Sequence, residues 1–64
     1  MSVPCELAGK VHGTRVSLDW TQQELAERAG VSRPSVARVE RGDDVSTATL
    51  EKVAAALGLR VELT

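Results

Sequence analysis

Aromatic side chains are almost missing from this sequence of 64 residues, which has one tryptophan and neither tyrosine nor phenylalanine. Any core is therefore aliphatic, and the abundance of leucine, valine and alanine favours helices over a β-sandwich. The single cysteine, Cys5, has no partner for an internal disulfide bond, so we expect a reduced, cytoplasmic protein. Neither Cys5 nor the single histidine, His12, belongs to a pattern typical of metal ligands, and no metal or cofactor is expected.

Long apolar runs are absent as well. No stretch approaches the roughly 18 apolar residues that span a bilayer, and Glu6 and Lys10 interrupt the first segment, so neither a membrane span nor a signal peptide is expected. The sequence offers no convergent set of nucleophile, base and stabilising group, and a chain of this length leaves little room for a pocket. We therefore expect neither an enzyme nor a small-molecule substrate.

The sequence also lacks a basic excess, because its net charge is −1. This argues against nucleic acid as a partner, since contacts with phosphate supply much of the affinity for DNA. The charges are unevenly distributed, however. Residues 28–41 contain four arginines and one glutamate, whereas residues 42–64 contain two basic and four acidic residues. A basic middle and an acidic end are compatible with DNA binding by the middle segment.

Periodicity and capping residues predict an all-α domain of four short helices, closed by a short C-terminal β-strand. No repeat, low-complexity tract or linker divides the sequence, so residues 1–64 are expected to form a single domain. The helices are expected at about Pro4–Val16, between Thr21 and Gly30, between Ser32 and Gly42, and at about Thr47–Leu57.

The second and third of these helices have the strongest local signals. Thr21 and Glu24 fit a capping box, and Gly30 provides the left-handed residue that ends a helix. Ser32 then fits an N-cap, with Pro34 in the first turn. Two short helices across so tight a turn form either an ordinary helical hairpin or a helix-turn-helix of about residues 21–42. The arginines and serines left outside on the second helix favour DNA binding.

The segment TQQELAERAGVSRPSVARVERG at residues 21–42 strongly resembles the phage repressor/Cro-type (Xre) helix-turn-helix family, and the likeness extends from about Arg15 to Gly58. The resemblance implies a repressor-like fold that binds double-stranded DNA with its recognition helix in the major groove. It also implies that Arg15 and Glu40 form a buried, structural ion pair between the first and third helices. The DNA-contacting positions implied by the resemblance are Gln22, Ser32, Arg33, Ser35, Ala37, Arg38 and Arg41.

Individual roles follow from the same likeness. Gln22 resembles the family's phosphate-contacting glutamine, and Arg41 is expected to touch phosphate near the helix end. Arg33 and Arg38 are expected to bond bidentately to guanine, while Ala37 is placed to meet a thymine methyl group. Pro34 departs from the family pattern, because this groove-facing position is often polar and proline cannot donate a hydrogen bond.

The last residues alternate strictly between apolar and polar types, which predicts a strand. A lone strand in a helical chain leaves its backbone unpaired, so we expect it to pair with a second copy and form a homodimer, the alternative being a disordered tail. The strand is similar in placement to that of HipB-like antitoxins, a branch of the Xre family. The expected dimer interface is formed by Leu59, Arg60, Val61, Glu62 and Leu63.

These features predict a homodimeric, sequence-specific repressor of a palindromic operator. The alternative is the antitoxin of a toxin–antitoxin pair, which binds its toxin and represses its own operon. An adaptor that has kept the fold and lost DNA binding is a third interpretation, and the acidic balance makes it reasonable. Among the remaining residues, Trp20 is expected to plug the core, Arg28 to pair with Glu24 one turn away, and His12 to lie on the surface.

Overall fold

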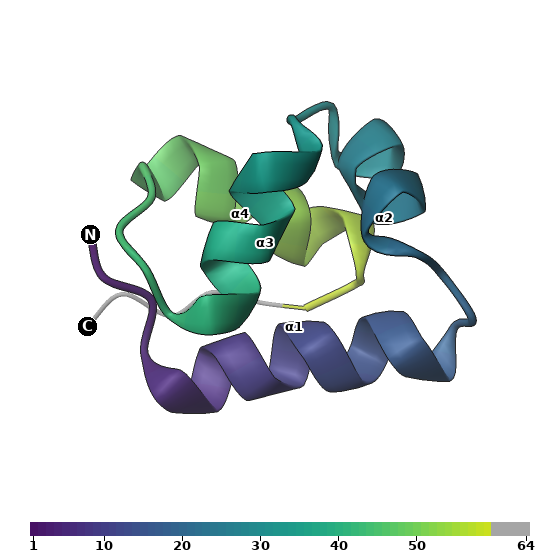
Figure 1. The fold of residues 1–64 in the computed structure, drawn as a ribbon, viewed down its shortest axis with the longest axis horizontal. Helices are drawn as coiled ribbons and strands as arrows, with labels where there is room; N and C mark the ends of the chain where they lie inside the picture. The colour runs from purple at the N-terminus through teal and green to yellow at the C-terminus, as the bar shows by residue number, and fades with distance from the viewer. Residues whose placement is uncertain (60–64) are drawn as a thin grey trace.

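Four α-helices form the regular secondary structure of the computed structural model, which describes residues 1–59 (Figure 1). The predicted all-α, four-helix architecture is thus confirmed for this part of the chain. The predicted strand lies almost wholly outside the described residues, and Leu59, its first residue, is not in a strand. The helices are α1 (Cys5–Ser17), α2 (Gln22–Ala29), α3 (Arg33–Arg41) and α4 (Thr47–Ala56).

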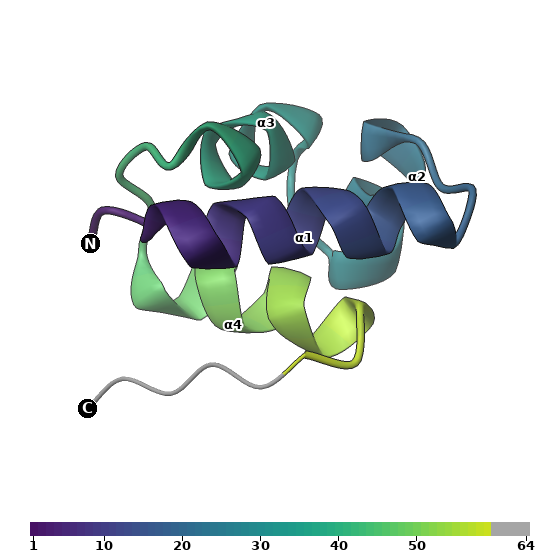
Figure 2. The ribbon, with the colours of Figure 1, turned by 90° about the horizontal axis from the view of Figure 1, so that it is seen from below.

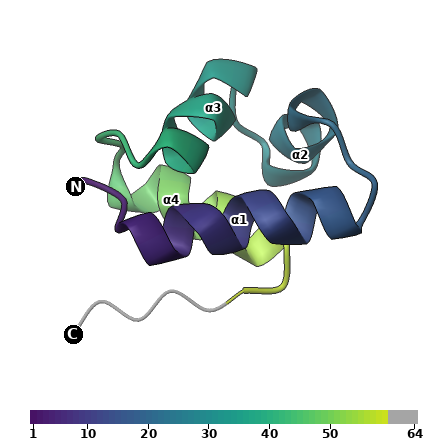
Figure 3. The ribbon, with the colours of Figure 1, turned by 60° about the horizontal axis from the view of Figure 1, so that its bottom comes forward.

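The helices pack around one aliphatic core. Helix α2 contacts both α3 and α4, and α1 lies along α3. Figure 2 looks onto α1 and shows α3 on one side of it and α4 on the other, while Figure 3 shows α2 and α3 together above α1. Of the four described helices, none is long and apolar enough to cross a membrane. The side chains with the least exposure come from every helix: Val11, Leu25, Val36, Val39, Leu50 and Val53.

Side-chain caps fix the starts of three helices. The predicted capping box is present at α2, where the Thr21 hydroxyl accepts a hydrogen bond from the Glu24 backbone N–H and the Glu24 carboxylate accepts one from the Thr21 N–H. Ser32 caps α3 through the N–H of Ser35, and Ser46 caps α4 in the same way. Each cap satisfies a backbone donor that the first turn leaves unpaired, which is worth about 1 kcal/mol.

All four helices end with the same pair of backbone hydrogen bonds. In each, a residue of positive φ (Asp19, Gly30, Gly42 or Gly58) separates the helix from the next segment. The N–H of the residue after it reaches back to a carbonyl five residues earlier, as in the 2.8 Å bond from Leu59 to Ala54. This is the Schellman arrangement, which satisfies carbonyls at the helix end and turns the chain sharply. Asp19 occupies the left-handed conformation that short polar residues tolerate.

Residues 1–3 are fastened to the loop that follows α3. The N–H of Val45 donates to the Met1 carbonyl at 2.9 Å, and Ser2 forms an isolated antiparallel bridge with Asp44. The Ser2 hydroxyl also donates to the Asp44 carboxylate at 2.6 Å. Val3 is 4% exposed and belongs to the core. This segment therefore steadies the loop at the C-terminal end of α3, which nothing in the residue pattern predicts.

Replacing Gly42 by alanine is expected to destabilise the fold more than replacing Gly30. Both glycines have positive φ, 78° and 71°, so alanine is strained by about 1–2 kcal/mol at either position. At Gly42 the added Cβ would also lie 3.2 Å from the Val3 carbonyl oxygen, whereas nothing lies within 4 Å at Gly30. Urea unfolding followed by circular dichroism measures the difference between the two variants.

Gly9→Ala is the matched control, because Gly9 lies inside α1 with nothing within 4 Å of an added Cβ. It is expected to stabilise the protein by about 0.5–1 kcal/mol. Equal losses at Gly42 and Gly30 would show that Val3 does not constrain the loop after α3.

Candidate nucleic-acid interface

The turn between α2 and α3 presents the start of α3 to solvent. Gly30, at φ 71° and ψ 34°, ends α2, and the N–H of Val31 bonds back to the Ala26 carbonyl. Ser32 caps the next helix two residues later, so only a few residues separate the two helices. Val36 and Val39 bury one side of α3 with 0% exposure, which leaves the opposite side free. The geometry is that of a helix-turn-helix with an outward-facing second helix.

The free side of α3 carries basic residues. Arg33, Arg38 and Arg41 are exposed, while the carboxylate-bearing side chain of Glu40 is turned inward and is 7% exposed. The helical spacing places Arg38 and Arg41 on the same face, one turn apart. Arg41 donates through Nε to Asp43 at 3.0 Å, an ion pair whose two side chains are 65% and 52% exposed. Such an exposed pair contributes little to stability, so Arg41 can exchange Asp43 for a phosphate at small cost.

Two predicted contact residues are engaged within the helix start. The Ser32 hydroxyl accepts from the Ser35 N–H at 3.3 Å, and its oxygen lies 2.8 Å from the Ser35 hydroxyl oxygen. Ser32 is exposed, whereas Ser35 and Ala37 are half-buried. The structure thus brings Ser32 and Ser35 together as a cap, with Ala37 beside them near the outward face.

An open cleft of about 540 Å³ lies where α2 begins, and Arg33 lines it from the start of α3. The cleft is also lined by Arg15, Thr21, Gln22 and Gln23. Backbone N–H groups at a helix start favour an anion, and the guanidinium groups add positive charge. The arrangement suits a phosphate group, and it places Arg33 beside Gln22 rather than beside Arg41.

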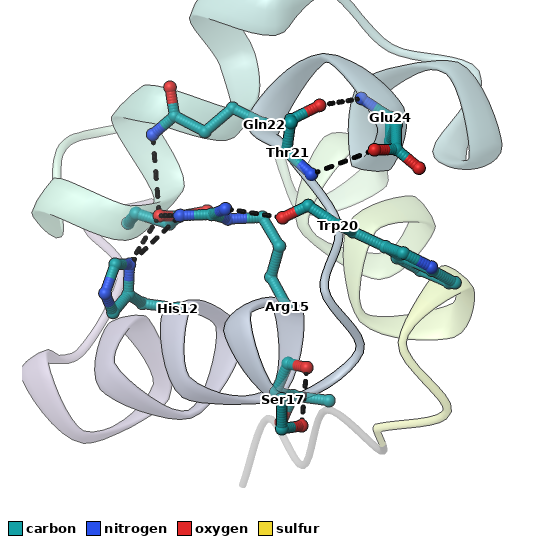
Figure 4. A network of polar contacts seen from close by, with 9 residues as sticks. His12, Arg15, Ser17, Trp20, Thr21, Gln22 and Glu24 are labelled. Carbon is teal, nitrogen blue, oxygen red and sulfur yellow. Dashed lines mark hydrogen bonds and ion pairs between the residues drawn. The ribbon is translucent and has the colours of Figure 1, made fainter.

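The Glu40 carboxylate holds three elements together, through bonds to Arg15 and Gln22. Figure 4 shows the polar network that contains these two residues and His12. Its Oε2 accepts from Arg15 Nε at 2.8 Å, and its Oε1 accepts from Arg15 Nη2 at 3.1 Å and from Gln22 Nε2 at 3.5 Å. The third nitrogen of the guanidinium, Nη1, donates to the backbone carbonyl of Trp20 at 2.7 Å. Arg15 on α1 therefore fixes α3 and the entry to α2 at once, and Gln22 is oriented by the same carboxylate.

His12 completes this network, which the sequence did not reveal. Its Nδ1 lies 2.8 Å from Glu40 Oε1, although the side chain is 58% exposed as expected for a surface residue. Because an ionised carboxylate only accepts hydrogen bonds, Nδ1 carries the proton and donates it. The 3.3 Å approach of Arg15 Nη2 to the same nitrogen is then a contact between two donors. The available signal was the three-residue spacing of His12 and Arg15, which places both on one face of α1.

Two effects oppose each other in setting the pKa of Glu40. Burial raises it, because the ionised form is removed from water. Hydrogen bonds from Arg15 and His12, the charge of Arg15 and the amide of Gln22 lower it, and together they leave the pKa of Glu40 below its usual value. The carboxylate is consequently ionised at neutral pH and can serve all three partners.

Trp20 and Arg28 contact each other across the start and end of α2. The Arg28 guanidinium lies 4.3 Å from the centre of the Trp20 ring, a cation–π contact. The expected pairing of Arg28 with Glu24 is therefore wrong: the carboxylate of Glu24 is occupied by the capping box and the indole offers Arg28 a surface. Trp20 is partly buried and packs against the core, in line with its predicted role.

Comparison with known proteins agrees with this geometry. The sequence model described as Helix-turn-helix matches residues 14–63, most of the chain. The chain belongs to the Xre/Cro-type helix-turn-helix family. Members of this family are DNA-binding transcription regulators rather than enzymes. Among residues 1–59, no group of three histidine, cysteine or acidic residues is placed to hold a metal ion.

A curated relative is a hypothetical transcription factor from Neisseria meningitidis serogroup B. It is 44% identical over 46 residues, which make up 70% of this chain and 43% of that protein. The chain thus spans less than half the length of this relative. The crystal structure of a hypothetical transcription factor from Neisseria, NHTF, matches with a TM-score of 0.74 and 38% identity, over 88% of this chain and 64% of that one.

HipB complexes match over the full length of the chain. A chain of the HipA–HipB–O2–O3 complex has a TM-score of 0.82 and 28% identity, and the match covers 100% of this chain and 92% of that one. A chain from the complex of a HipB variant with an O2 20mer gives the same TM-score and identity, with 90% of that chain covered.

Glu40→Gln is expected to lower the free energy of unfolding at pH 7. It is also expected to make that free energy depend less on pH in the acidic range. The pKa of Glu40 is lower in the folded state than the usual 4.5, so its contribution is fully present above that value and is lost as pH falls through the folded-state pKa. At pH 7 we expect a loss of about 1.5–3 kcal/mol, the range for hydrogen bonds to charged groups. The difference between the wild type and Glu40→Gln should shrink as the pH is lowered.

Urea titrations between neutral and acidic pH provide this measurement. Glu51→Gln removes the same charge from an exposed position on α4 and should keep the wild-type pH dependence. A constant difference between wild type and Glu40→Gln over the whole range would contradict the stated role of the carboxylate.

Proposed function

We propose that the protein is a sequence-specific transcriptional regulator that represses a palindromic operator as a homodimer. The observation that carries the proposal is the outward face of α3, whose exposed charged residues are arginines and whose carboxylate is turned inward. Membership of the helix-turn-helix family supports docking with α3 in the major groove. In the dimer the two recognition helices would lie about 34 Å apart, one turn of B-DNA.

The proposed contacts divide into positioning and reading. Gln22 and Arg41 contact phosphate, Gln22 from the cleft at the start of α2 and Arg41 from the end of α3. Arg38 reads guanine from the outward face of α3. Arg33 reads guanine at the start of α3, and its place in the cleft also brings it near the DNA backbone. The remaining proposed contacts at the helix start are made by Ser32, Ser35 and Ala37.

A second role, as an antitoxin, is favoured by one observation. The full-length match to a chain of the HipA–HipB–O2–O3 complex relates this fold to a protein that assembles with a protein partner as well as with O2 and O3. We propose that this chain likewise binds a toxin and represses its own operon. The two roles are compatible, because the HipA–HipB–O2–O3 complex contains the partner protein together with O2 and O3.

The homodimer is proposed to form through the alternating residues at 59–63, Leu59, Arg60, Val61, Glu62 and Leu63, which would pair antiparallel across a twofold axis. A chain of this size buries only about 60% of its unfolded surface, so association would add stability.

Arg38→Ala is expected to weaken binding to a selected operator more than binding to unrelated duplex. Loss of a bidentate contact with guanine corresponds to roughly 5- to 150-fold in affinity for the operator. Arg33→Ala should behave in the same way if Arg33 reads a base. Gel-shift titrations with both duplexes measure the two losses, and Lys52→Ala, which removes one positive charge from α4, is the control. Equal losses on both duplexes would assign the arginine to phosphate.

Removing residues 60–64 is expected to convert the dimer into a monomer. Leu59 is kept, because its N–H bonds to the Ala54 carbonyl at 2.8 Å and its side chain packs against the core. Light scattering over a range of concentrations gives the molar mass, and circular dichroism shows whether the helices are retained. A folded, truncated chain that stays dimeric would place the interface elsewhere.

A further inference from the structure

Recognition of adenine is poorly served by the side chains of α3. Asparagine and glutamine are the residues that bond bidentately to adenine, and neither occurs in the α3 sequence RPSVARVER. A carboxylate can accept a hydrogen bond from the amino group of cytosine. The one carboxylate of α3 is that of Glu40, which is 7% exposed and bonded to Arg15 and His12, so it does not face the groove. Hydrogen bonding to bases from α3 is therefore left to arginine and serine.

The serine and glutamine side chains near the interface already form hydrogen bonds within the protein, which they must share or exchange in order to contact DNA. The Ser35 hydroxyl oxygen lies 2.8 Å from that of Ser32, within the cap. On α2, the amide nitrogen of Gln22 donates to Glu40, and that of Gln23 donates to Glu27 at 3.2 Å. Arginine pairs best with the two acceptors of guanine. Because α3 contains neither asparagine nor glutamine, it offers no side chain that can bond bidentately to adenine.

An apolar surface lies among the arginines instead. Pro34 is exposed in the first turn of α3, and Ala37 follows it one turn later, half-buried beside Arg38. Side chains three and four residues apart on a helix are neighbours, so the proline ring and the alanine methyl group lie next to each other. In the major groove, the apolar feature that such a surface meets is the methyl group of thymine.

We propose that Pro34 and Ala37 together form a docking surface for thymine methyl groups, so that the protein identifies A·T pairs by thymine and G·C pairs by Arg38. This inference rests on the proposed function, because it concerns how the same helix reads its operator. The proposal gives Pro34 a role in specificity through its apolar ring. The absence of a hydrogen-bond donor alone would mean that Pro34 does not contribute to recognition of a base.

The test begins with the full chain and a pool of random duplexes, from which bound sequences are selected. Thymines of the selected half-site are then replaced one at a time by deoxyuridine, which removes only the methyl group. At the positions read by Pro34 and Ala37, each replacement should reduce affinity roughly three- to fourfold, the change expected for one buried methyl-sized group. Replacements outside the half-site, in the same duplex, are the control.

The variants Pro34→Ser and Ala37→Ser connect the effect to these residues. Each variant should bind the thymine and deoxyuridine duplexes equally at the base position that the replaced residue contacts. At the base position contacted by the other residue, it should keep the wild-type preference for thymine. Melting temperatures compared with the wild type show that the variants are folded. Tight binding of every deoxyuridine duplex, a selected half-site without a fixed thymine, or an undiminished methyl effect in both variants would overturn the inference.

Failure of the proposed function gives a different result. If no sequence is enriched from the pool, the protein does not read DNA and the inference falls with the function. If sequences are enriched and tolerate deoxyuridine throughout, sequence-specific binding stands and only the methyl-docking surface is refuted.

Discussion

The carboxylate of Glu40 is the point on which the arrangement of the two DNA-facing helices depends. It binds Arg15 through both oxygens and shares one oxygen with His12 and Gln22, while Arg15 also binds the carbonyl of Trp20. A nearly buried carboxylate without these donors would be strongly unfavourable, so the charges and their partners stand or fall together. The result is a fixed separation between the start of α2 and the outward face of α3, the two parts of the proposed DNA interface.

Local signals in the sequence were sufficient for the helices and their limits. The capping residues Thr21 and Ser32, together with the glycines that follow α2 and α3, act within a few residues of where they stand, and the structure has them as predicted. Arg28 shows the limit of local reasoning. The spacing of four residues predicted an ion pair with Glu24, but the fold places the indole of Trp20 under the Arg28 guanidinium instead. The contact of His12 with Glu40 joins residues 28 apart, and only packing of α1 on α3 creates it.

The same limit applies to the DNA-facing surface. The residue pattern predicted exposed arginines on α3, and the family resemblance implied their roles. Neither showed which side chains already form hydrogen bonds within the protein. Ser35, Gln22 and Gln23 form hydrogen bonds within the protein, and Arg41 pairs with Asp43, which it would have to exchange for a phosphate in the proposed complex. With a net charge of −1, the sequence gives little general attraction for DNA, so in the proposed complex the specific contacts must supply more of the affinity.

Trp20, whose carbonyl is bonded to Arg15 and whose ring lies under Arg28, is the sole aromatic residue in the sequence. Its indole is therefore a built-in fluorophore located at the joint between α1 and α2. A nearby guanidinium and a partly apolar setting influence the emission of an indole, so separation of α1 from the DNA-facing helices alters the fluorescence without any attached dye. The same residue that closes the core thus makes the geometry of the joint measurable in solution.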